Sequence, residues 1–244
     1  MKRSCLAVFA SAALATAFAS QQAEAVTFSA DADAFYQLGA PTSTSGGSST
    51  QLTVKDSGGG TTTRQAWIRF DVSGNPIDDL LSASLQLTVS QRSAGGTNNS
   101  AAQLNYPIEV FALKDGNAGE NWSEATTNWN TAPANNTSNN ELVAAQVTFL
   151  GSFIVLGTAN PGDLFNFTSA AFEQFLKDDT DGLVTFMINR EGGSGSNNLS
   201  FASKENTGRT GPLLNVELPA VPEPATAGLS LLGLAVLARR RRKA

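Results

Sequence analysis

The sequence contains no histidine, and its only cysteine is Cys5. The chain therefore cannot form a Ser-His-Asp triad, an internal disulfide or a zinc site built from cysteine and histidine. Basic residues are also scarce. Between Val26 and Val221 there are 9 lysines and arginines against 19 aspartates and glutamates, a net charge of −10. An acidic stretch without a basic run is a poor nucleic-acid binder, so no nucleic-acid partner is expected.

The amino terminus has the three parts of a secretory signal peptide. Met1–Arg3 is basic, Leu6–Phe18 is apolar, and Ala23 and Ala25 form a small-x-small cleavage motif. The sequence predicts a signal helix and cleavage by signal peptidase after Ala25. The alternative, a membrane anchor, is disfavoured because the apolar run is short for a span.

The carboxy terminus has a second ordered signal. It begins with the motif Val221, Pro222, Glu223 and Pro224. The uncharged apolar run Ala225–Ala238 follows, and the basic cluster Arg239–Lys243 comes after it. The run predicts a hydrophobic helix of about 21 Å, short for a stable span, with its basic end held in the cytoplasm.

This arrangement resembles the PEP-CTERM sorting signal. The resemblance implies recognition by an exosortase and a Gram-negative bacterium that makes exopolysaccharide. It also implies transient anchoring in the inner membrane through this segment alone, and display on the outer surface or in the extracellular matrix. The alternative is an ordinary carboxy-terminal anchor.

The sequence between these signals predicts an all-β domain. We therefore divide the chain into 1–25, 26–220 and 221–244. Period-2 alternation marks half-buried strands at 51–55, 65–71, 84–89, 108–113, 147–149 and 213–218, and the more apolar segment 182–188 predicts a central strand. Turn-forming linkers separate them, which is typical of an antiparallel two-sheet sandwich. One amphipathic helix is expected at 168–177, capped by Thr168 or Ser169 and plugging one end of the sandwich.

Four landmarks occur in a set order along this domain. They are Asp31–Tyr36 with Leu52–Lys55, then Arg64–Val72, then Trp122–Asn130, and last Phe201–Glu205 ahead of Pro212–Val216. This set resembles the DNRLRE domain, which corresponds to carbohydrate-binding module family 96, over about Thr27 to Leu218. The resemblance implies a jelly-roll-like β-sandwich that binds acidic polysaccharide, with alginate as the associated ligand class. Two departures bear on ligand preference: Lys204 stands where the family usually has arginine, and the 93–105 loop is long.

An anionic sugar requires fixed cations, and a guanidinium grips a carboxylate with two hydrogen bonds. The candidate ligand-binding residues are Lys55, Arg64, Trp67, Arg69, Arg190 and Lys204, with Arg209 as a further cation. Trp67 shares a strand face with Arg69 and offers a flat ring for a pyranose. The alternative is that Arg69 pairs with Glu205 or Asp71 and that Trp67 packs under a loop. Trp122 and Trp129 are interpreted as anchors of the loop between them.

The turn after the helix concentrates the carboxylates of Asp178, Asp179 and Asp181. Calcium prefers such oxygen ligands, so a structural calcium is a weaker alternative to solvated turn acids. No other cofactor is indicated. Nothing in the sequence brings paired carboxylates together in a cleft, so an enzyme is not expected.

Three functions are compatible with these observations. The first is a non-catalytic exported protein that binds acidic polysaccharide. The second is a structural matrix or adhesion protein without sugar binding. An exposed apolar strand edge would favour this function. The third is a polysaccharide lyase or hydrolase, which would need a tyrosine or glutamate facing an arginine in a cleft. Tyr36 and Tyr106 are the only tyrosines.

Overall fold

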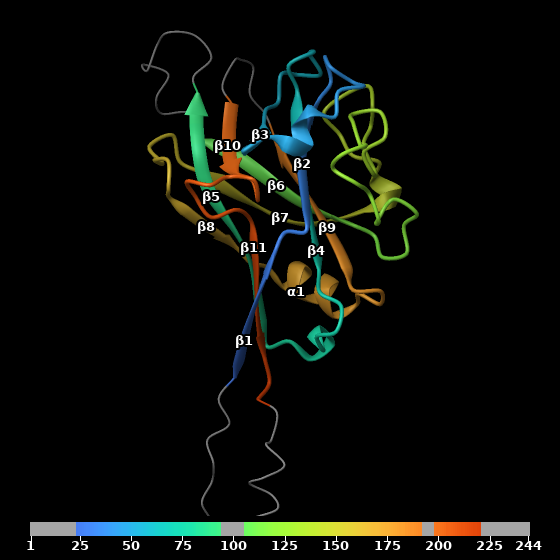
Figure 1. Cartoon of the computed structure of the whole chain (residues 1–244), viewed down its shortest axis with the longest axis vertical. Helices are drawn as coiled ribbons and strands as arrows, with labels where there is room; N and C mark the ends of the chain where they lie inside the picture. The colour runs from blue at the N-terminus through green and yellow to red at the C-terminus, as the bar shows by residue number, and fades with distance from the viewer. Residues whose placement is uncertain (1–22, 94–104, 192–197, 221–244) are drawn as a thin grey trace, which may run out of the picture. The chain divides into compact units, whose positions relative to one another are not determined.

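The structure is a computed structural model that describes residues 23–93, 105–191 and 198–220. Residues Ala23–Pro219 form one compact unit (Figure 1). The predicted signal helix and the motif and helix from Val221 onwards lie outside the described residues. Among the described residues, no helix is long and apolar enough to cross a membrane.

The domain consists of two antiparallel sheets, as predicted. The first has the order β1-β11-β5-β10-β3, with β8 pairing β5. Its strands are β1 (Glu24–Ser29), β3 (Gln51–Val54), β5 (Ser82–Ser93), β8 (Leu164–Phe167), β10 (Asn198–Ala202) and β11 (Leu213–Leu218). The strand pairing brings the two ends of the domain together, because β1 runs beside β11 from Glu24–Leu218 to Ser29–Leu213.

The second sheet has the order β2-β4-β9-β6-β7. Its strands are β2 (Ala32–Gln37), β4 (Arg64–Asp71), β6 (Tyr106–Leu113), β7 (Val147–Val155) and β9 (Leu183–Arg190). The strand β9 lies at the centre, as its continuous apolar sequence predicts. Short 3₁₀ helices occur at Ser45–Ser48, Ile77–Asp79 and Ala144–Gln146.

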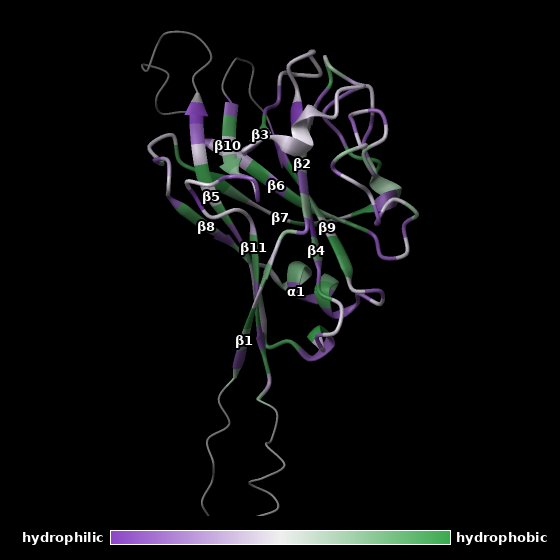
Figure 2. Cartoon of the chain, viewed as in Figure 1, coloured by the Kyte–Doolittle hydropathy of each residue, from purple (hydrophilic) through white to green (hydrophobic). Residues whose placement is uncertain are grey.

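The alternating side chains of the strands build the core between the sheets. On β4, Ala66, Ile68 and Phe70 are buried in this core, as predicted. The predicted helix also forms: α1 spans Ala170–Lys177, and the Ser169 hydroxyl accepts a hydrogen bond from the Phe172 amide at 3.0 Å. The Phe172 ring packs 5.1 Å from that of Phe186, so the apolar face of α1 belongs to the same core. Figure 2 colours the strands and α1 by the hydropathy of their residues.

The opposite face of β2, β4 and β9 in the second sheet is buried as well, contrary to the expectation that β4 is half-buried, whereas β6 alternates as predicted. The loop segment 114–146, beside β2 and β9 in Figure 1, covers that face. It contributes Trp122 and Trp129 to a second apolar cluster, which also contains Trp67, Tyr36 and Met187 of the sheet. The fold therefore has a third layer made of loop, which period-2 patterning does not reveal.

Four strands were not among those predicted: β1, β2, β8 and β10. They are short, from 4 to 6 residues, and lie next to turn-forming sequence. The pairing of β1 bears on the predicted cleavage site. Cleavage after Ala25 would remove the partners of Leu218 and Glu217 and leave Val26–Ser29 paired with β11.

Candidate functional site

Three of the predicted cations gather at one end of the sandwich. Lys55 follows β3, Arg64 begins β4, and Arg190 ends β9. The backbones of Lys55 and Arg64 pair directly, with N–O distances of 2.9 and 2.8 Å. Because β4 and β9 are antiparallel, the start of one lies beside the end of the other. We call Lys55, Arg64 and Arg190 the cation cluster.

The side chains of the cation cluster are held in place. The Arg64 guanidinium donates to Gln37 Oε1 at 2.9 Å and to Asn198 Oδ1 at 3.1 Å. The Arg190 guanidinium lies 4.8 Å from the centre of the Tyr106 ring. Lys55 is only 7 % exposed. Within the described residues, neither Lys55 nor Arg64 forms an ion pair with a carboxylate.

The electrostatics of the cation cluster favour an anionic partner. Burial lowers the pKa of Lys55, and the charges of Arg64 and Arg190 lower it further. Burial also lowers the pKa values of the two arginines, although Tyr106 and the nearby carboxylate of Asp56 partly offset this for Arg190. Like charges held together under partial burial raise the free energy of the charged state. A bound carboxylate would relieve this repulsion.

The structure assigns Arg69 to an ion pair. Its Nη2 lies 2.7 Å from Asp31 Oδ2, its Nη1 donates to the Trp122 carbonyl, and its guanidinium lies 5.7 Å from the centre of the Trp122 ring. The partner is Asp31 rather than the expected Glu205 or Asp71. These contacts fasten the covering loop to β4.

Lys204 is also engaged by carboxylates. Its Nζ forms ion pairs with Glu124 Oε1 at 2.8 Å and with Glu205 Oε1. Burial lowers the pKa of Lys204, but these two carboxylates raise it by more. Lys204 therefore links two loops. Neither the Arg69 nor the Lys204 ion pairs involve a residue of the cation cluster.

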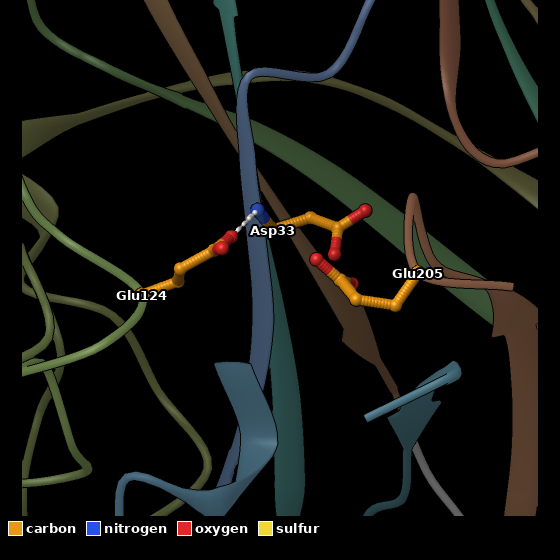
Figure 3. A group of neighbouring side chains, drawn as sticks. All are labelled: Asp33, Glu124 and Glu205. Atoms are coloured by element: carbon orange, nitrogen blue, oxygen red, sulfur yellow. Dashed lines mark hydrogen bonds between the residues drawn. The ribbon is translucent and has the colours of Figure 1, made fainter. Parts of the chain in front are cut away.

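A buried carboxyl group completes this network. Figure 3 shows Glu124 and Glu205 on opposite sides of Asp33, with Glu124 accepting a hydrogen bond from the Asp33 amide at 3.0 Å. Asp33 is 0 % exposed, and its Oδ1 has no partner among the described residues. Burial first, and then the nearby charge of Glu205, raise the pKa of Asp33 to about 8, although the Lys204 amide donates to Oδ2. Asp33 thus holds a proton near neutral pH.

Trp67 is not the sugar platform that its position on the strand predicted. Its ring is 0 % exposed, lies 5.4 Å from that of Tyr36, and donates from Nε1 to the Pro133 carbonyl at 3.1 Å. The covering loop hides it, which is the alternative that the sequence left open. Trp122 and Trp129 are buried too, in agreement with their interpretation as anchors.

The predicted acidic turn is only partly brought together. Carboxylate oxygens of Asp179 and Asp181 lie within 4.8 Å of one another and of Asp115, whereas Asp178 is outside this group and accepts from Gln174. Buried Glu120 adjoins Asp181. Burial and the neighbouring carboxylates raise the pKa of Glu120 to about 7 and that of Asp179 to about 6. Oxygen ligands of this kind suit a hard cation.

A groove that sequence reasoning missed lies on the outer face of the second sheet. It has a volume of about 610 Å³ and runs between β6, β9, the loop residues 139–144 and the turn after β3 that contains Asp56. Its lining includes Glu109, Phe111, Asn189 and Glu191. No linear motif marks it, because its residues come from separate segments joined only by folding.

The family model that matches the chain defines its class, a carbohydrate-binding module. The chain belongs to carbohydrate-binding module family 96, which it matches over residues 24–149. The PEP-CTERM protein-sorting motif matches residues 220–243. No curated protein matches the chain. The family match ends within β7, yet β9 lies between β4 and β6, so the folded domain continues beyond it.

These two matches establish the broad function. The chain is an exported carbohydrate-binding protein that carries an exosortase sorting signal, and this signal is typical of cell-surface proteins. Modules of this family are typically not catalytic, and neither matched region is a catalytic domain.

Proposed function

We propose that this protein binds acidic, uronate-containing polysaccharide through the cation cluster, without chemical change to the sugar. The observation that supports this is the collection of Lys55, Arg64 and Arg190 at one end of a domain with a net charge of −10. A guanidinium and an ammonium close together match the carboxylates of a uronate polymer. Arg69 and Lys204 are left out of the proposed site because carboxylates of the chain already pair with them, and Trp67 because the covering loop packs over its ring; Lys55 and Arg190 are 7 % and 3 % exposed.

We further propose how the chain is divided into regions and how it is exported and sorted. The signal peptide at 1–25 directs export, the domain at 26–220 binds polysaccharide, and the segment 221–244 is a substrate for exosortase. The apolar run of that segment anchors the chain transiently in the inner membrane. The mature domain then resides at the outer surface or in the extracellular matrix of a Gram-negative bacterium.

Affinity electrophoresis tests the ligand class. The purified chain is run in gels that contain polyuronate or neutral glucan, and retardation is expected with the polyuronate alone. The variants Lys55→Met and Arg64→Gln should each weaken retardation about tenfold, or about 1.4 kcal/mol. The exposed Arg209 provides the matched control Arg209→Gln, which should migrate like the unchanged chain. Equal retardation by neutral glucan, or none in either gel, would reject uronate binding.

A second function is favoured by a different observation. The edge strand β7 exposes Phe149 and Ile154, which are 52 % and 56 % exposed, and neighbouring Leu156 is exposed as well. An open strand edge with apolar side chains can pair with another chain. A structural matrix role through self-association is therefore the alternative. For the lyase alternative, Tyr106 does face an arginine, Arg190, but both side chains are buried, and Tyr36 is buried as well.

A further inference from the structure

The groove between β6, β9 and residues 139–144 differs chemically from the cation cluster. None of the residues that line it is a lysine or an arginine. Its volume of about 610 Å³ is within the range of ordinary ligand sites, roughly 300–1,000 Å³. All its lining residues are among those that the structure describes.

The groove is rich in negative charge. Glu109 on β6, Glu141 on the covering loop and Glu191 after β9 all line it. Within the described part of the chain, none of these three carboxylates forms an ion pair with a lysine or arginine. Burial and the nearby charge of Glu191 raise the pKa of Glu109, which shows that the negative charges are crowded. A uronate would be repelled here, whereas a cation would be attracted.

The groove also presents a buried acceptor that lacks a donor. Asn189 lines the groove and is 4 % exposed. Its Nδ2 donates to the Asn140 carbonyl at 2.7 Å, but its Oδ1 has no partner among the described residues. A buried acceptor without a donor is unfavourable, because it has given up its hydrogen bonds to water. The groove is therefore suited to a ligand that brings hydrogen-bond donors.

An apolar surface lies beside these acceptors. Phe111 and Leu142 line the groove, and the Phe111 ring packs 5.2 Å from the partly exposed ring of Phe149. An aromatic ring can contact the apolar face of a pyranose while the polar groups around it bind substituents. The groove thus combines a hydrophobic surface, hydrogen-bond acceptors and unpaired carboxylates.

We propose that this groove is a second carbohydrate site, and that it binds a polysaccharide of amino sugars with free, protonated amines. The ammonium groups would pair with Glu109 and Glu191, and the hydroxyls would donate to the amide oxygens. Neutral sugars would leave the carboxylates unpaired. The inference goes beyond uronate binding and does not depend on it, because other side chains line the groove, although Asp56 and Glu191 directly follow Lys55 and Arg190 of the cation cluster. A module with both sites would link an anionic polymer to a cationic one.

Calorimetric titration of the purified chain tests this site. One probe is a glucosamine hexamer with free amines, and the other is the N-acetylated hexamer of the same linkage. At low salt and mildly acidic pH the free-amine hexamer should bind at least tenfold more tightly. Glu109→Gln and Glu191→Gln should each weaken its binding about tenfold, and retardation in polyuronate gels should be unchanged. The control Glu173→Gln, on α1, should have no effect.

Three results would overturn the assignment. Equal affinity for the two hexamers would show that the amine is not recognised. If neither hexamer binds, and cooperative unfolding shows that the chain is folded, the groove is not a carbohydrate site. Displacement of the free-amine hexamer by an equimolar amount of spermine or calcium would show plain cation attraction rather than sugar recognition. Failure of the uronate test with success here would reject only the cation cluster as a ligand site.

Discussion

Trp67→Ala should lower the free energy of unfolding by about 3–5 kcal/mol, because it empties the centre of the second apolar cluster. The ring is completely buried against Tyr36, and the covering loop depends on it for packing. Thermal and urea unfolding, followed by tryptophan fluorescence and circular dichroism, measure the loss. A loss of this size is a large part of the stability of an ordinary domain. The midpoints of thermal and urea unfolding should therefore both fall clearly.

Two further variants separate packing from ligand contact. Trp67→Phe retains most of the buried ring but removes the hydrogen bond to the Pro133 carbonyl, and should cost about 1–2 kcal/mol. It should bind polysaccharide like the unchanged chain. Phe149→Ala, at an exposed position, should change the stability by less than about 1 kcal/mol. If the Trp67→Phe chain keeps its stability but no longer binds polysaccharide, Trp67 contacts the ligand and the present assignment is wrong.

Asp33→Asn should remove a large part, on the order of half, of the pH dependence of stability between about pH 4 and pH 8. The folded chain keeps the Asp33 proton up to a pKa of about 8, whereas the unfolded chain releases it near 3.8. The native state therefore binds more protons in this window, and its stability falls as the pH rises. Glu120, with a pKa of about 7, and Asp179, with a pKa of about 6, act in the same direction.

The expected result is an Asp33→Asn chain that is more stable than the unchanged chain at pH 8, by an amount on the order of 2 kcal/mol. The new amide can donate to Glu205 Oε2, which has no partner among the described residues. Urea unfolding at a series of pH values measures the slope of the free energy of unfolding against pH. Asp78→Asn, at an exposed aspartate, should keep the original slope. An unchanged slope in the Asp33→Asn chain would show that Asp33 is ionised in the folded state.

The site residues show where inference from sequence stops. Arg69 and Trp67 were correctly placed on one face of a strand, since alternation gives the face directly. What covers that face comes from residues 114–146, about fifty positions along the chain. The burial of Trp67 under Pro133 and the hydrogen bond from Arg69 to the Trp122 carbonyl therefore depend on a long-range contact that no local pattern encodes.

Two groups of neighbouring carboxylates show the same limit. Local sequence concentrates Asp178, Asp179 and Asp181 in one turn. Only the tertiary structure brings Asp115 next to Asp179 and Asp181, and Asp178 is not part of this group. Asp33, Glu124 and Glu205 lie in three separate landmarks, and folding brings their oxygens within 4.8 Å. Both groups come together because loops from distant segments meet at the ends of strands.

The sequence by itself determined the fold class, the central strand, the capped helix and the family, because alternation, caps and linear motifs act within a few residues. It also determined the sorting signal, which is linear. Only the tertiary structure decided which cations gather, which are neutralised, and where a groove opens. Strand order and loop docking place distant residues side by side, and the charge and exposure of a binding surface are properties of that arrangement.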